Sequence, residues 1–145
     1  MTLIPLYRGL TTLLGPAVRF YLGQRLRHGK EDALRFGERE GRASRARPPG
    51  PLVWIHAASV GEAVSTLAFI DRLIAERPAL NVLVTTGTVT SARLLGTRLP
   101  TGHAWHQYVP VDRLLYVRRF LDHWRPDLAI RSEERRVGEE CRSRW

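Results

Sequence analysis

The chain has 145 residues, 43% of them hydrophobic and 26% charged, which is long and apolar enough for one folded domain with a core. Its single cysteine excludes a disulfide framework and a cysteine-based zinc site, and it lacks the apolar run of about 18 residues that an ordinary membrane span needs. The net charge of +9 is concentrated in residues 1–50, which carry ten basic and four acidic side chains.

Residues 3–22 are apolar with ordered interruptions. At helical periodicity the interrupting residues fall within one narrow stripe: Arg8, Thr12, Gly15 and Arg19. Pro16 predicts a kink or the start of a second helix. An apolar helix with a thin cationic stripe is typical of a membrane interface, so we predict a membrane-associating helix over residues 1–24. The alternative is a helix that packs on its own domain.

Eight basic residues follow between Arg25 and Arg47. They favour contact with an anionic membrane surface, at about 1 kcal/mol for each residue near the headgroups. The alternative is a solvated charged segment. Three prolines within residues 48–51 resist both helix and strand. We therefore interpret residues 25–51 as a basic segment that ends in a proline-rich linker.

From residue 52 onwards, strand and helix patterns alternate. Strands are predicted over residues 52–56, 81–86 and 107–109 and from 128, and helices over 62–76, 90–99 and 112–124. Asp112 is the predicted cap of the last helix. Its predicted inward residues are Leu114, Val117, Leu121 and Trp124. The alternation predicts an α/β fold over residues 52–130, with a doubly wound parallel sheet and helices on both faces.

The segment between the first strand and its helix reads Trp-Ile-His-Ala-Ala-Ser-Val-Gly-Glu and ends at Glu62. Ser59 and Glu62 have the spacing of a capping box, in which each side chain bonds the backbone N–H of the other residue. Glu62 is also predicted at the carboxyl edge of the sheet, where open α/β sheets bind ligands and a carboxylate can accept a proton. The two interpretations are compatible, although a helix N-terminus lowers the basicity of a carboxylate.

Residues 131–145 interrupt the fourth strand with nine charged side chains and no apolar period. This stretch resembles the translation of a common short-read sequencing adapter, which it matches at 14 of 15 positions. We therefore predict that the native sequence ends near Ile130 and that the chain is a fragment of a longer protein. The alternative is a native charged tail.

The segment Trp54–Glu62 resembles the signature of the 3-deoxy-D-manno-octulosonic acid (Kdo) transferases of lipopolysaccharide assembly. The likeness extends over most of residues 6–130. Its further blocks are Gly29–Glu31, Glu38–Gly41, Thr85–Ser91, Tyr108–Asp112, Arg119–Leu121 and Pro126–Leu128. The resemblance implies that the chain is the N-terminal, acceptor-side, Rossmann-like half of a GT-B glycosyltransferase, with the C-terminal half absent.

The resemblance also implies an inverting transfer of Kdo from CMP-Kdo to the lipid A precursor, with Glu62 as the proton acceptor. Glu133 stands in the register of the family's second functional carboxylate, but its adapter-like surroundings make that agreement a coincidence. Ser59, Gly61, Lys30 and Thr86 are candidate substrate-binding residues; for Lys30 a solvated face, and for Thr86 a turn role, are open alternatives. No cofactor or catalytic metal is implied, and the expected location is the cytoplasmic face of the inner membrane.

The sequence leaves two alternative functions. The first is a basic nucleic-acid- or membrane-surface-binding module without catalysis; the basic segment lacks interleaved aromatic residues, so a nucleic-acid partner is not expected. The second is a dinucleotide-dependent oxidoreductase, disfavoured because the first turn reads Ala-Ala-Ser-Val-Gly-Glu instead of Gly-x-Gly-x-x-Gly. Without its C-terminal half, the chain is expected to be inactive.

Overall fold

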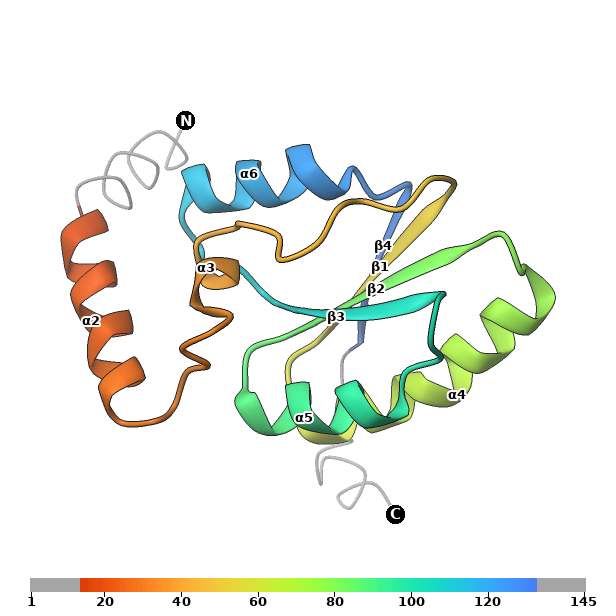
Figure 1. Cartoon of the computed structure of the whole chain (residues 1–145), viewed down its shortest axis with the longest axis horizontal. Coiled ribbons are helices and arrows are strands. Elements are labelled where there is room, and N and C mark those ends of the chain that lie inside the picture. The colour runs from red at the N-terminus through yellow and green to blue at the C-terminus, as the bar shows by residue number, and fades with distance from the viewer. Residues whose placement is uncertain (1–13, 133–145) are drawn as a thin grey trace, which may run out of the picture.

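A computed structural model of the chain describes residues 14–132 (Figure 1). Arg8, Thr12 and Glu133 lie outside the described residues. The elements in chain order are α2 (Gly15–Arg27), α3 (Phe36–Arg39), β1 (Leu52–Ala57), α4 (Val60–Glu76), β2 (Asn81–Thr86), α5 (Val89–Arg98), β3 (Ala104–Tyr108), α6 (Leu114–Trp124) and β4 (Leu128–Ser132).

The four strands form one sheet in the order β3-β2-β1-β4, and every neighbouring pair is parallel. Helices α4 and α5 lie on one side of the sheet and α6 lies on the other (Figure 1). This arrangement confirms the predicted α/β class, with a Rossmann-like parallel sheet wound in both directions from β1. Because the strands are parallel, the segments that follow β1, β2 and β3 emerge at one common carboxyl edge.

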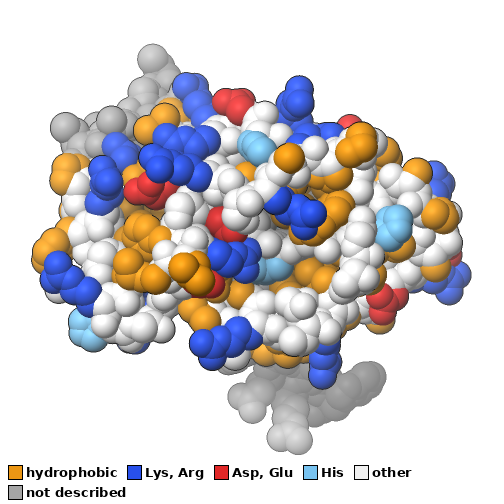
Figure 2. Space-filling view, in the orientation of Figure 1, with side chains coloured by type: hydrophobic (Ala, Val, Ile, Leu, Met, Phe, Trp, Pro, Cys, Tyr) orange, Lys and Arg blue, Asp and Glu red, His pale blue; other side chains and the backbone are white. Residues whose placement is uncertain are grey.

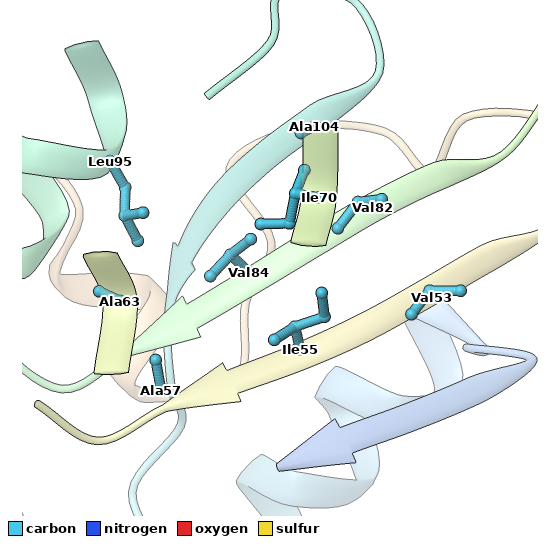
Figure 3. Packing of buried hydrophobic residues seen from close by; sticks show 9 residues of the cluster. All are labelled: Val53, Ile55, Ala57, Ala63, Ile70, Val82, Val84, Leu95 and Ala104. Carbon is cyan, nitrogen blue, oxygen red and sulfur yellow. The ribbon is translucent and has the colours of Figure 1, made fainter. Parts of the chain in front are cut away.

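Alternate residues of each strand feed two separate cores. Val53, Ile55 and Ala57 of β1 pack with β2 against α4 and α5 (Figure 3). On the opposite face, a smaller cluster contains Leu52, Leu83, Phe120 and Trp124. Burying a large apolar side chain contributes about 1.5–3 kcal/mol, so both faces of the sheet stabilise the fold.

Helix α6 differs from its prediction in its start and in its inward face. Arg113 is its N-cap residue, and the Arg113 side chain makes no capping hydrogen bond, so the assignment of Asp112 as the cap residue was wrong. The buried residues are Tyr116, Phe120 and Trp124, whereas Leu121 is 38% exposed. The helix carries an aliphatic and an aromatic stripe, and the aromatic stripe packs on the sheet because it buries more area.

Both outer strands also differ from the sequence prediction. β3 starts at Ala104, three residues before the predicted strand, because Trp105 and His106 are only half-buried and form no continuous apolar run. Within the strand, Gln107 is buried and accepts the indole N–H of Trp124 (2.8 Å). β4 extends to Ser132 and pairs with β1 only, which leaves Leu128 and Ala129 exposed at the edge of the sheet. The predicted buried fourth strand is therefore an exposed edge strand in this chain.

The segment before β1 contains two buried glutamates, of which Glu38 contacts the sheet. Glu38 accepts the backbone N–H of Tyr108 (2.7 Å), and its partner Arg35 donates to the carbonyl of His106 (2.7 Å). This ion pair occupies the open edge of β3 in place of a fifth strand. Glu31 contacts Arg25 (2.7 Å) and Arg39 (3.3 Å) and thereby links α2 to α3. Arginines of the basic segment thus bond to the sheet and to the buried carboxylates of Glu31 and Glu38.

Among residues 14–132, no helix has both the length and the hydropathy needed to cross a bilayer.

Candidate active site

The turn between β1 and α4 places Glu62 at the carboxyl edge of the sheet. Ser59 is the N-cap residue of α4, and its Oγ accepts the backbone N–H of Glu62 (3.1 Å). The Glu62 carboxylate accepts the backbone N–H of Ala58 through Oε2 (2.7 Å). The predicted capping interaction is therefore present in part, because the returning bond goes to Ala58 instead of Ser59. The turn fixes the carboxylate through one oxygen only.

Glu62 is partly exposed, and it lies in the first turn of a helix of 17 residues. A partly exposed carboxylate at a sheet edge can accept a hydrogen bond or a proton from a ligand. Gly61 precedes it and is exposed, whereas Ser59 is half-buried.

The neighbouring turn after β2 is occupied by capping contacts. Thr88 is the N-cap residue of α5, and its hydroxyl accepts the backbone N–H of Ser91 (3.2 Å). Thr86 is fully buried, and its hydroxyl lies 2.9 Å from Nε2 of His106. Burial lowers the pKa of His106 to about 3, with a further contribution from the charge of Arg35. The Thr86 side chain therefore lies in the protein interior, next to His106.

Two cavities adjoin the carboxyl edge. A cavity of about 410 Å³ lies between α2 and the turns after β2 and β3. Its lining residues are Val18, Tyr21, Leu22, Arg25, Arg39, Gly87, Thr88 and Val111. A second cavity, of about 300 Å³, lies beside the ends of β1 and β4. Trp54 and His56 of β1 line this second cavity.

Lys30 lies in the loop after α2, and its side chain is exposed. Its backbone N–H donates to the carbonyl of Arg25 (3.0 Å), and it lines a shallow cavity of about 220 Å³ with Tyr21 and His28. Lys30 and Glu62 thus belong to different surface features. Within residues 14–132, no group of three or more His, Cys, Asp or Glu side chains is placed to hold a metal ion.

Sequence reasoning missed the buried roles of Glu31 and Glu38. Both stand in a run of arginines, where a charged segment is ordinarily solvated. The available signal was the spacing of Arg35 and Glu38, which is that of an i, i+3 ion pair.

The family profile described as "3-Deoxy-D-manno-octulosonic-acid transferase (kdotransferase)" matches residues 34–135, well over half of the chain. The chain belongs to this family. The matched Kdo transferase region includes the turn that carries Glu62 and all four strands of the sheet.

Named Kdo transferases show the same relationship. The chain is 40% identical over 125 residues to the 3-deoxy-D-manno-octulosonic acid transferase of Rickettsia bellii, covering 86% of this chain and 30% of that protein. It is 47% identical over 79 residues to the Rickettsia typhi transferase, covering 54% and 17% of the two chains. For Bordetella pertussis the identity is 34% over 138 residues, covering 87% and 32%. The chain therefore spans less than a third of the length of these relatives, and no solved structure matches it.

Proposed function

We propose that this chain is the acceptor-side part of an inverting glycosyltransferase that transfers Kdo from CMP-Kdo to the lipid A precursor. Membership of the Kdo transferase family supports the reaction class. The observation that carries the proposal is the placement of Glu62, a partly exposed carboxylate at the carboxyl edge of the sheet. This edge is where open parallel sheets bind their ligands.

In the proposed reaction, Glu62 is the general base. The acceptor hydroxyl gives its proton to Oε1 of Glu62 while its oxygen bonds to the anomeric carbon of Kdo. The bond from that carbon to the CMP phosphate oxygen breaks on the opposite face, and CMP leaves with the electron pair. The bond from Ala58 N–H to Oε2 would hold the carboxylate in orientation during this step.

The acceptor is an acylated, phosphorylated glycolipid, so the enzyme must work at a membrane surface. Helix α2 exposes Phe20 (66%) and Tyr21 (58%), and the loop after it exposes Leu34 (98%). In Figure 2, hydrophobic and basic side chains lie next to one another on this side of the molecule. Exposed apolar side chains beside cations are typical of interfacial binding. We assign this surface to peripheral binding on the cytoplasmic face of the inner membrane.

Vesicle binding tests this assignment. The chain should sediment with vesicles containing phosphatidylglycerol, and Leu34→Asp should reduce the bound fraction several-fold. Leu115→Asp is the matched control, because Leu115 is 53% exposed but lies on α6. Equal loss in both variants, or equal binding to vesicles of phosphatidylcholine alone, would contradict the assignment.

Residues 131–145 resemble a translated sequencing adapter, so we propose that they are non-native. Genomic sequencing across codon 131 tests this directly: the reading frame should continue into a second domain. The register agreement at Glu133 would then be an accident of the joined sequence. A genome that encodes residues 131–145 followed by a stop codon would contradict it.

The transfer itself is tested with the natural full-length gene product. It should release CMP from CMP-Kdo only when the lipid A precursor is present, and the lipid should gain a Kdo residue. The 145-residue chain should be inactive in the same assay. If the full-length protein shows no transfer but binds duplex DNA with strong salt dependence, the non-catalytic binding module is the better description.

A further inference from the structure

A cavity of about 300 Å³ opens beside the end of β1 on the side of the sheet that carries α6. Its walls come from β1, from β4 and from the residue after β3. The lining residues are Trp54, His56, Val109, Ala129, Ile130 and Arg131. Apart from His56 and Arg131, these side chains are apolar or aromatic. Arg131 belongs to the segment proposed as non-native, so the inference rests on Trp54 and His56.

One buried hydroxyl anchors both of these side chains. Thr85 Oγ1 accepts the indole N–H of Trp54 (2.8 Å) and lies 3.0 Å from Nδ1 of His56. Thr85 is fully buried, so this anchor cannot exchange freely with water. Trp54 also packs on Phe120, with ring centroids 4.9 Å apart. The indole is therefore held in one orientation before any ligand arrives.

Because Nδ1 of His56 faces Thr85, Nε2 is the ring nitrogen left for a ligand. Partial burial lowers the pKa of His56 and so favours the neutral imidazole. A neutral imidazole next to an aromatic ring suits an uncharged, hydroxyl-bearing ligand better than it suits a phosphate.

His56 and Glu62 lie on either side of the turn that joins β1 to α4. The charge of Glu62 acts to raise the pKa of His56 against the larger effect of burial. The cavity thus opens at the same carboxyl edge of the sheet as the carboxylate assigned as general base.

We propose that Trp54 and His56 form the subsite for the acceptor sugar ring that carries the attacking hydroxyl. The apolar face of a pyranose would lie on the indole, and a ring hydroxyl would bond Nε2 of His56. His56 would thereby position the attacking hydroxyl next to Glu62 without transferring a proton itself. This inference rests on the proposed function and names the part of the surface that holds the acceptor.

Two substitutions at His56 separate the anchoring nitrogen from the ligand-binding nitrogen. In the full-length gene product, His56→Asn keeps an amide near the Nδ1 position but loses the group at Nε2. His56→Gln places its amide near the Nε2 position. A neutral hydrogen bond contributes about 0.5–1.5 kcal/mol, so His56→Asn should raise the acceptor KM roughly 2.3- to 13-fold. His56→Gln should restore much of that loss, and neither should change the KM for CMP-Kdo.

The Glu62→Gln variant distinguishes a failure of the proposed general base from a failure of the proposed acceptor subsite. That variant should lower kcat at an unchanged acceptor KM, so it tests the general base, whereas the His56 variants test the subsite. An acceptor KM for His56→Asn within twofold of the wild-type value, with an unchanged Tm, would overturn the subsite.

A binding measurement on the wild-type protein tests the subsite even if a variant fails to fold. In the wild-type protein, the imidazole nitrogens of His56 should shift in an NMR titration with a glucosamine disaccharide. The resonances of His123, on the far end of α6, should stay in place. Absence of any His56 shift at saturating disaccharide would overturn the proposal.

Discussion

Glu38 offers a stability test of how the basic segment joins the sheet. Its side chain is 1% exposed and receives hydrogen bonds from Arg35, from the hydroxyl of Ser44 and from the backbone N–H of Tyr108. Arg35 in turn bonds the carbonyl of His106, so the pair closes the free edge of β3. Glu38→Gln keeps the shape of this side chain but removes its charge. It also replaces one accepting oxygen by an NH2 group, which faces the hydrogen-bond donors that surround Glu38.

The expected loss follows from these contacts. Breaking a buried ion pair by removing one partner costs about 3–5 kcal/mol. Arg35 is 29% exposed, so solvent screens part of the interaction, and we expect Glu38→Gln to cost about 2–4 kcal/mol. Glu40→Gln is the matched control, since Glu40 pairs with Arg19 and Arg42 only at 3.8 Å and both arginines are well exposed. Its loss should stay below about 1 kcal/mol.

Urea denaturation followed by tryptophan fluorescence measures both variants against the parent chain. Trp54 and Trp124 lie in the core beside the sheet, so their emission reports the global transition. Equal midpoints for Glu38→Gln and the parent chain would show that the segment before β1 is not part of the cooperative unit.

Two more tests address stability. The pKa of His106 is about 3 in the folded chain, below the ordinary histidine value of 6.5, so the unfolded chain binds protons more readily between these limits. The contribution of this group to the free energy of unfolding should be fully present above pH 6.5 and fall as the pH drops towards 3, by at most about 1.4 kcal/mol per pH unit. In His106→Gln, the urea midpoint should therefore decline less steeply with falling pH than in the parent chain. Equal slopes of midpoint against pH in the two proteins would contradict the assignment. Gly41 and Gly29 both have positive φ angles, but only at Gly41 would an added Cβ meet backbone, 2.0 Å from the carbonyl oxygen of Tyr116. Gly29→Ala should therefore cost only the left-handed penalty of about 1–2 kcal/mol, and Gly41→Ala should lower the Tm clearly further; equal shifts would count against the close packing of this loop on α6.

The sequence predicted the centre of the sheet better than its margins. β2 was predicted with its observed bounds and β1 to within one residue, because continuous apolar runs are typical of strands buried on both faces. β3 is an edge strand whose buried Gln107 is bonded to Trp124 across the fold, and no local pattern reveals such a partner. In α6, the pattern predicted the burial of Trp124 correctly but missed Tyr116 and Phe120, since only the facing sheet decides between the two stripes.

At the candidate site, local spacing predicted the bond from Glu62 N–H to Ser59 but not the choice of Ala58 as the partner of the carboxylate. Contacts inside one turn depend on a few neighbouring residues, and sequence reasoning can reach them. The bond between His56 and Thr85 joins two strands 29 positions apart, so it depends on the register of β1 with β2. The same limit hid the bond from Tyr108 N–H to Glu38, which joins residues 70 positions apart.

The central claim is that Glu62 accepts the proton of the acceptor hydroxyl. Its most direct test is the kcat of Glu62→Gln in the natural full-length enzyme, with CMP-Kdo and the lipid A precursor both saturating. Glu76→Gln, at the exposed far end of the same helix, is the control for charge removal. General-base catalysis contributes about 10²- to 10⁴-fold, so Glu62→Gln should lose at least that much turnover at an unchanged Tm while Glu76→Gln keeps wild-type turnover. A Glu62→Gln enzyme with a kcat near that of the wild type would contradict the account.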